Sequence, residues 1–116
     1  MNKFKELKVW QKSIQLVTNI YSATANFPKE EIYGIISQIR RCAVSIPSNI
    51  AEGAGRGTKK DFSHFLDIAK GSSFELETQL IISKELGFID NNIFVLILSE
   101  LEEIQKMITG LQKSLN

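Results

Sequence analysis

The chain has 116 residues, which is the length of one domain built around a single hydrophobic core. Lys and Arg number 14 and Asp and Glu number 13, so the formal net charge of +1 excludes a globally basic nucleic-acid-binding protein. Apolar residues make up 43% of the chain, a fraction typical of a globular protein and not of a disordered one.

Apolar residues recur at helical spacing along the whole chain, beginning with a helix predicted over about residues 5–26. One face of this helix collects apolar residues three or four positions apart: Trp10, Ile14, Val17, Tyr21 and Ala25. Phe27 and Pro28 end the helix, because the residue before a proline is biased away from helical dihedrals.

A second helix is predicted over about residues 29–53, since Pro28 is tolerated in a first turn. Pro47 lies within its apolar stripe and removes one backbone hydrogen bond, so we expect a kink there and not a stop. The glycine-rich segment 53–57 ends the helix, because glycine readily takes the positive φ found beyond a last turn.

Capping residues mark the two remaining helices. Thr58 is predicted to cap a third helix over about residues 59–86, and Gly87 followed by Phe88 is typical of its C-terminal end. Asp90 is predicted to cap a fourth helix over about residues 91–115.

Four amphipathic helices with short connections predict an all-α fold, an antiparallel up-down-up-down four-helix bundle that forms a single domain over residues 1–116. A long array of helical hairpins is the structural alternative, but such an array would have a repeat period and none is visible.

Two helices carry more apolar surface than one core needs. Phe74 and Ile81 lie seven residues apart and roughly 100–120° from the core line of the third helix. The fourth helix is apolar almost all round at 93–98, a stretch that includes Phe94. This surplus predicts self-association through Phe74, Ile81 and Phe94, and the alternative is a wide core with scattered exposed hydrophobic side chains.

Gly71 lies in the middle of the third helix, where glycine costs ~1 kcal/mol relative to alanine. We expect another backbone to approach closely there, with the Pro47 region as a candidate neighbour. The alternative is that the glycine is merely tolerated.

Charge is distributed unevenly along the chain. Residues 40–60 hold five basic residues against Glu52 alone, and residues 1–12 hold four against Glu6. In an antiparallel bundle the loop at 53–58 closes one end, where we expect Arg56, Lys59 and Lys60 to cluster and to be able to contact phosphates. The candidate nucleic-acid-binding residues are Arg40, Arg41, Arg56, Lys59 and Lys60. A solvated end balanced by acids from neighbouring helices is the alternative.

Arg40 and Glu77 each flank the core edge of a helix, the second and the third. We therefore hypothesise an Arg40–Glu77 pair across these antiparallel helices. Its role would be register and not net stability, since desolvation offsets the Coulomb attraction. Arg40 is thus a candidate both for this pair and for phosphate contact.

Residue types that carry catalysis or bind metals are scarce. His64 is the only histidine and is predicted to face solvent, and Cys42 is the only cysteine and is predicted to be a buried structural thiol. We therefore expect no enzyme activity, no catalytic residue, no metal, no cofactor and no small-molecule substrate.

The sequence also bears on the compartment. The longest apolar run, residues 93–98, is too short to span a membrane, and the first twelve residues lack the apolar region of a secretory signal. A single cysteine cannot form an internal disulfide, which agrees with a reducing environment. We expect a cytoplasmic protein with no membrane partner.

An ordered string of residues over 27–88 resembles one bacterial protein family. Its segments are Phe27-Pro28, Gln38-Ile39-Arg40-Arg41, Asn49-Ile50-Ala51-Glu52-Gly53, Asp61-Phe62, Gly71-Ser72 and Glu75-x-Glu77-Thr78. In these positions the chain is similar to the four-helix-bundle proteins encoded in intervening sequences of 23S ribosomal RNA genes. The resemblance is strong over 27–88, weak around Trp10, and one of general character in the fourth helix.

The resemblance implies an antiparallel four-helix bundle, commonly assembled as a homopentameric barrel. It also implies similarity to the accessory variability proteins of diversity-generating retroelements, which bind nucleic acid and a reverse transcriptase. The intervening-sequence proteins have no agreed biochemical activity, so the resemblance implies no catalytic residue.

Three functional hypotheses follow. The first is a non-enzymatic, self-associating bundle that binds RNA or a ribonucleoprotein partner through basic residues. The second is a protein–protein scaffold with no nucleic-acid role. The third is an enzyme or small-ligand-binding protein with a polar, solvent-connected pocket around Glu77.

Overall fold

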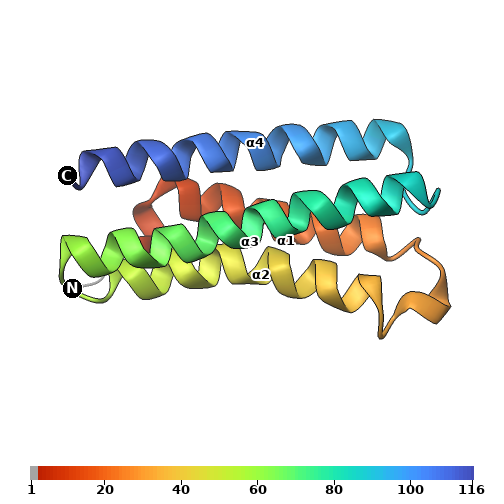
Figure 1. Cartoon of the computed structure of the whole chain (residues 1–116), viewed down its shortest axis with the longest axis horizontal. Helices are drawn as coiled ribbons and strands as arrows, with labels where there is room; N and C mark the ends of the chain where they lie inside the picture. Colours follow the sequence, from red (N-terminus) through yellow and green to blue (C-terminus); the bar gives the residue numbers. More distant parts are fainter. Residues whose placement is uncertain (1–2) are drawn as a thin grey trace.

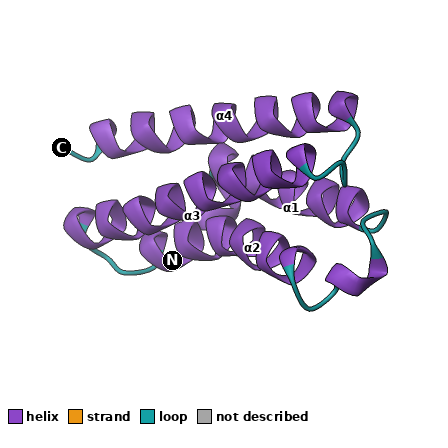
Figure 2. Cartoon of the chain, turned by 45° about the vertical axis from the view of Figure 1, so that its right-hand side comes forward, coloured by secondary structure: helices purple, strands orange, loops and turns teal. Residues whose placement is uncertain are grey.

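The computed structural model describes residues 3–116, and this part of the chain is helical with short connections. Two 3-10 turns, at Phe4–Glu6 and Lys29–Glu31, accompany four α-helices (Figures 1 and 2). The four helices are α1 (Lys8–Thr24), α2 (Ile35–Ala54), α3 (Lys59–Glu85) and α4 (Asn91–Ser114). The predicted all-α class is confirmed; residues 1–2 of the predicted domain lie outside the described residues.

The four helices pack side by side in a bundle of 43 × 23 × 20 Å. Each helix contacts the next one along the chain, and α4 closes the bundle against α1. Successive helices run in alternate directions, as the order of colours in Figure 1 shows. Side chains across the α2–α3 contact agree, because Gln79 donates to Gln38 and Ser72 bonds to Ser45. The predicted four-helix bundle is confirmed.

The predicted start signals of α3 and α4 are hydrogen-bonded caps. The Thr58 hydroxyl oxygen accepts from the backbone N–H of Asp61 at 3.1 Å, and Asp90 Oδ1 accepts from the N–H of Asn92 at 2.7 Å. Each cap satisfies a backbone donor that has no partner inside its helix.

The end of α3 is the glycine cap that its sequence predicts. Gly87 takes a φ of +75°, and the N–H of Phe88 donates to the carbonyl of Ser83 at 2.9 Å. The Phe88 ring then packs against Phe27, near the start of the connection between α1 and α2, with ring centroids 5.8 Å apart. This contact ties together the two connections at that end of the bundle.

Helix starts differ from prediction in the first half of the chain. The helix expected from residue 5 begins at Lys8, because extended backbone at Leu7 separates it from the Phe4–Glu6 turn. The helix expected from residue 29 begins at Ile35, since Gly34 has a non-helical ψ of −117° after the Lys29–Glu31 turn. As expected, α2 continues through Pro47 without stopping.

The inner face of α1 is rotated relative to the prediction. Ile14 and Tyr21, which belong to the predicted apolar face, are 39% and 43% exposed. The residues that α1 buries are Val9, Ser13, Leu16, Ile20 and Thr24.

Two hydroxyl residues explain this rotation. Ser13 donates to the carbonyl of Val9 at 2.7 Å, and Thr24 donates to that of Ile20 at 2.8 Å. Because each hydroxyl is satisfied within its own helix, it can be buried without an unpaired polar group. A pattern that counts only apolar residues places such positions outside the core.

The close approach expected at Gly71 occurs instead at Gly53. A side chain at Gly71 would meet nothing from neighbouring elements within 4 Å, so that prediction is wrong for the single chain. A Cβ at Gly53 would lie 2.7 Å from the Cβ of Phe65 and 3.2 Å from the carbonyl oxygen of Phe62. The C-terminal end of α2 therefore approaches α3 at a position with no room for a side chain.

Across residues 3–116, no helix combines the length and the hydropathy that crossing a membrane requires.

Candidate nucleic-acid interface

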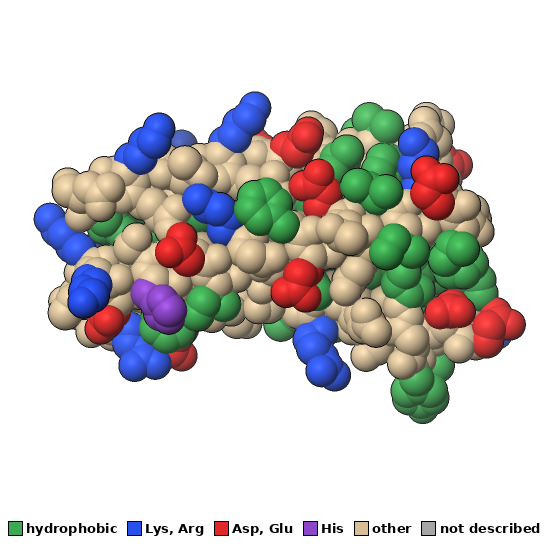
Figure 3. Space-filling model, viewed as in Figure 1, with side chains coloured by type: hydrophobic (Ala, Val, Ile, Leu, Met, Phe, Trp, Pro, Cys, Tyr) green, Lys and Arg blue, Asp and Glu red, His purple; other side chains and the backbone are tan. Residues whose placement is uncertain are grey.

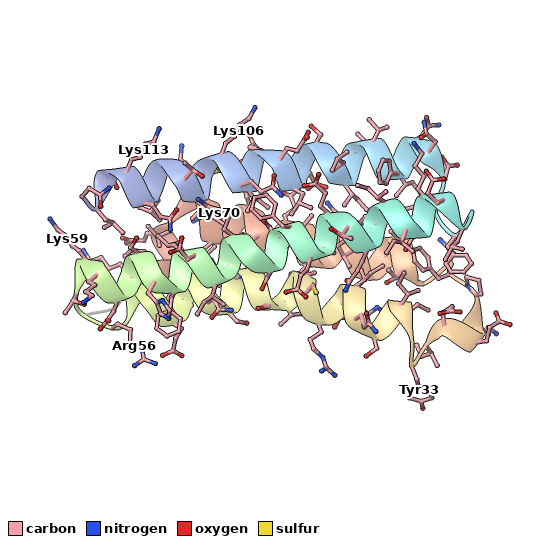
Figure 4. All side chains as sticks on the ribbon, in the orientation of Figure 1. Tyr33, Arg56, Lys59, Lys70, Lys106 and Lys113 are labelled. Carbon is pink, nitrogen blue, oxygen red and sulfur yellow. The ribbon has the colours of Figure 1, made fainter. Side chains whose placement is uncertain are left out.

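The up-down path gathers three basic segments at one end of the bundle. The N-terminal segment, the α2–α3 connection and the last turn of α4 all lie at the left end of Figure 1. Figure 4 shows Arg56 and Lys59 projecting from this end and Lys113 projecting from α4 close to it. We call the following residues the basic end: Lys3, Lys5, Lys8, Arg56, Lys59, Lys60 and Lys113.

The small net charge conceals an asymmetry between the two halves of the bundle. The half formed by residues 3–15, 46–72 and 103–116 holds ten Lys and Arg residues against five Asp and Glu residues. The half formed by residues 16–45 and 73–102 holds four against eight. On the face drawn in Figure 3, basic side chains gather toward the left and acidic ones toward the right. The molecule is therefore electrically dipolar along its long axis.

Most cations of the basic end have no carboxylate partner. Within the described residues, two ion pairs form: Lys12 with Glu103 at 2.9 Å, and Arg56 with Glu52 at 3.0 Å. Lys59 and Lys60, in the first turn of α3 after the Thr58 cap, are exposed. Their charges are available to an external anion such as a phosphate.

Arg56 is held in place from two sides. Its Nε donates to a carboxylate oxygen of Glu52, and its guanidinium lies over the Phe65 ring, 4.8 Å from the centroid. The pairing partly neutralises its charge, while the ring contact orients its planar group. Arg56 thus contributes a fixed planar cation more than a free charge.

The structure separates the five predicted binding residues into two groups. Arg40 and Arg41 lie on α2 and Arg56 lies just beyond its end, so roughly 20 Å of helix separates them at 1.5 Å per residue. Arg41 is exposed in the acidic half. Arg56, Lys59 and Lys60 lie together at the 53–58 end, as expected, whereas the continuous helix α2 carries Arg40 and Arg41 away from that end.

Arg40 links α2 to α1. Its Nε donates to the Thr24 hydroxyl oxygen at 2.9 Å, and its guanidinium lies 4.5 Å from the centroid of the Tyr21 ring. A second donor reaches the carbonyl oxygen of Tyr21 at 3.4 Å. These contacts give Arg40 a structural role.

The hypothesised Arg40–Glu77 pair is not formed. Glu77 accepts from Gln105 Nε2 of α4 at 3.0 Å, on the side of α3 that faces away from α2. Each residue does flank the core, but Arg40 faces α1 and Glu77 faces α4. Ser45 and Ser72 occupy the α2–α3 contact instead, with their hydroxyl oxygens 2.9 Å apart.

Of the predicted self-association residues, one is buried in the bundle and two are exposed. Phe94 is only 6% exposed and lies under the Lys84 ammonium group, so it belongs to the bundle's own core and not to an outer surface. Phe74 and Ile81 are 52% and 43% exposed. In the apolar stretch of α4, the exposed side chains are Ile93, Val95 and Leu96.

The residues with potential reactivity lie apart from one another. His64 is exposed, as expected, and meets the Phe65 ring edge-on with centroids 5.5 Å apart. Cys42 is half-buried, and its Sγ donates to Glu75 at 3.9 Å. Burial, together with the nearby Glu75 carboxylate, raises the pKa of the Cys42 thiol. Within residues 3–116, no three His, Cys, Asp or Glu side chains gather in a way that suits a metal ion.

Sequence reasoning did not assign the N-terminal lysines or Lys113 to the site. The charge count marks residues 1–12 as basic, but as a segment separate from residues 40–60. The signal that joins them is the topology, because an up-down bundle brings its N-terminus, its second connection and its C-terminus to one end.

Comparisons with known proteins identify a family and a solved structure of the same fold. The model of the 23S rRNA-intervening sequence protein family matches residues 5–110. A solved structure of a protein with unknown function, from the S23 ribosomal protein family of Bacteroides thetaiotaomicron, is 25% identical with a TM-score of 0.84. That alignment covers 90% of this chain and 95% of the solved one. No curated protein matches the sequence.

Proposed function

Because the chain belongs to the 23S rRNA-intervening sequence protein family, we propose that it is a non-enzymatic, self-associating bundle that binds RNA, free or within a ribonucleoprotein, through its basic end. One observation carries the proposal, namely ten basic against five acidic residues in one half of a nearly neutral protein. The description of the solved relative as a member of a ribosomal protein family supports RNA as the ligand. A cytoplasmic location is part of the proposal.

The energetic basis is the release of counterions from the phosphate backbone. A lysine that neutralises a phosphate releases condensed cations, so the logarithm of the binding constant falls linearly with the logarithm of the salt concentration. For single strands, each such contact adds ~0.7 to the magnitude of this slope, which we call the salt slope. Lys59 and Lys60 suit this role because they are exposed and have no carboxylate within ion-pairing distance.

Self-association would repeat this modest patch in one particle. Exposed apolar side chains support it, in particular Phe74 and Ile81 on α3 and Val95 and Leu96 on α4. The family resemblance suggests a pentamer as the particle. Several basic ends on one RNA would raise a weak single-site affinity by multivalency.

The test is a salt series of RNA binding on paired variants. In Lys59→Gln/Lys60→Gln, we expect the magnitude of the salt slope for single-stranded RNA to fall by about 1.4. The matched control, Lys29→Gln/Arg41→Gln, removes two exposed cations from the acidic half and should leave the slope unchanged. Equal effects of the two double variants would contradict the basic end as the binding surface.

A protein–protein scaffold is the second candidate, and the exposed apolar side chains favour it. It predicts material free of co-purifying RNA, no salt-sensitive RNA binding at low ionic strength, and an unchanged particle mass after nuclease treatment. Mass-resolved size-exclusion chromatography before and after nuclease distinguishes the two candidates.

A further inference from the structure

We propose that the basic end holds an unpaired nucleobase in a hollow beside His64, so that its preferred ligand is single-stranded and not duplex RNA. This inference rests on the proposed function and specifies the ligand class of the same site. The hollow has a volume of about 450 Å³ and lies between the first turns of α3 and the end of the chain at 115–116. The α3 residues that line it are Lys59, Lys60, Ser63, His64 and Asp67.

His64 lines the hollow and belongs to a cluster of three planar side chains beside it. The His64 ring meets Phe65 edge-on, with an interplanar angle of 74°, and the Arg56 guanidinium lies over the Phe65 ring. His64 is exposed, and so is about half of the Arg56 side chain. Unstacked RNA bases are bound on aromatic rings and on arginine planes, which this cluster offers next to phosphate-binding lysines.

The Asp67 carboxylate favours a base over a phosphate at its own wall of the hollow. Gln112 of α4 fixes the wall, since its Nε2 donates to Asp67 Oδ1 at 2.7 Å and to the Ser63 carbonyl at 3.2 Å. A carboxylate repels a phosphate but accepts hydrogen bonds from the amino edge of a base. Lys59 and Lys60 then suit the phosphates on either side of the bound nucleotide.

A duplex cannot use these groups in the same way. In an A-form helix the base faces are stacked inside, and the major groove is too deep and narrow for side chains to read. The lysines can still contact the phosphates of a duplex, but the ring of His64 and the carboxylate of Asp67 gain nothing.

The experiment compares a short, non-self-complementary single-stranded RNA with the blunt duplex formed by adding its complement. For the wild-type protein we expect tighter binding of the single strand at the same salt. For His64→Ala we expect a loss of at least about fivefold for the single strand, from the removal of one base–aromatic stack, and no change for the duplex.

Two further variants make the result specific. His64→Phe keeps a planar ring and should retain most of the single-strand affinity. Tyr33→Ala removes an aromatic side chain that is 95% exposed in the acidic half, and it should have no effect. Because His64 and Tyr33 are both exposed, far-ultraviolet circular dichroism should show an unchanged helical fold for all three variants.

The outcomes separate this inference from the proposed function. Equal wild-type binding of single strand and duplex would overturn the base site but leave the basic end as the RNA surface. A His64→Phe variant as weak as His64→Ala would also overturn it. Absence of binding to either RNA at low salt would overturn the proposed function itself.

Discussion

At Gly53, α2 and α3 approach so closely that the position has no room for a side chain, whereas Gly71 on α3 is open to its surroundings. The two glycines lie in helices of the same bundle but differ in whether the packing has room for a side chain. Gly53 is required by packing, while Gly71 carries only the entropic penalty of glycine in a helix.

We therefore expect Gly53→Ala to lower the free energy of unfolding by about 1–3 kcal/mol, because a methyl group forces α2 away from Phe62 and Phe65. Gly71→Ala should raise it by about 0.5–1 kcal/mol. Urea unfolding of the two variants measures both. A destabilising Gly71→Ala would show that this surface is covered in solution.

The Cys42 thiol makes the free energy of unfolding depend on pH in the alkaline range. Since burial and Glu75 raise its pKa above the ordinary value of 9.0, the folded protein holds the thiol proton more tightly than the unfolded chain does. This stabilisation is complete below that ordinary value and is lost as the pH rises through the folded-state pKa. Urea unfolding from neutral to alkaline pH should therefore show a steeper loss for the wild type than for Cys42→Ala. Parallel curves would contradict a raised pKa.

Between elements, side-chain bonds determine which helices are joined. Arg40 bonds α2 to α1 through Thr24 and Tyr21, and Glu77 bonds α3 to α4 through Gln105. The bundle is thus joined on two opposite sides by partners that a helical wheel does not identify.

Double-mutant cycles test this assignment. Arg40→Ala combined with Tyr21→Ala should give a coupling energy of about 0.5–1 kcal/mol, the usual range of an exposed cation–π contact. Arg40→Ala combined with Glu77→Ala should give none above about 0.3 kcal/mol. A larger coupling in the second cycle would restore the pair that the sequence suggested.

For the whole molecule, the separation of buried and exposed apolar residues decides whether a substitution affects the fold or the assembly. Phe94 belongs to the core, while Phe74 and Ile81 lie on the surface of the single chain. The dipolar charge distribution is also a property of the whole, since no one segment carries it.

Phe94→Ala should lower the free energy of unfolding by about 3–5 kcal/mol. Phe74→Gln/Ile81→Gln should leave stability nearly unchanged but reduce the particle mass, since it removes exposed apolar area from an association surface. Thermal unfolding and mass-resolved size-exclusion chromatography measure the two effects. An unchanged particle mass in the double variant would show that the association surface lies elsewhere, for example at Val95 and Leu96.

Local chemistry by itself determined that there are four helices, the caps of α3 and α4, and the bundle. Thr58, Asp90 and Gly87 act within one turn of chain, and the spacing of apolar residues defines a core face in three of the four helices. The exception is α1, where Ser13 and Thr24 are buried because each bonds to a carbonyl of its own helix. A pattern that counts only apolar residues does not reveal that these hydroxyl groups have hydrogen-bond partners.

The tertiary structure alone decided which neighbour each flanking residue meets. A helical wheel gives the angle of Arg40 or Glu77 from the core, but in a four-helix square each helix has a neighbour on either side. Only packing distinguishes the two sides, and it likewise brings lysines from three distant segments to one end. A chain with a net charge of +1 thus has a basic end because its helices alternate in direction.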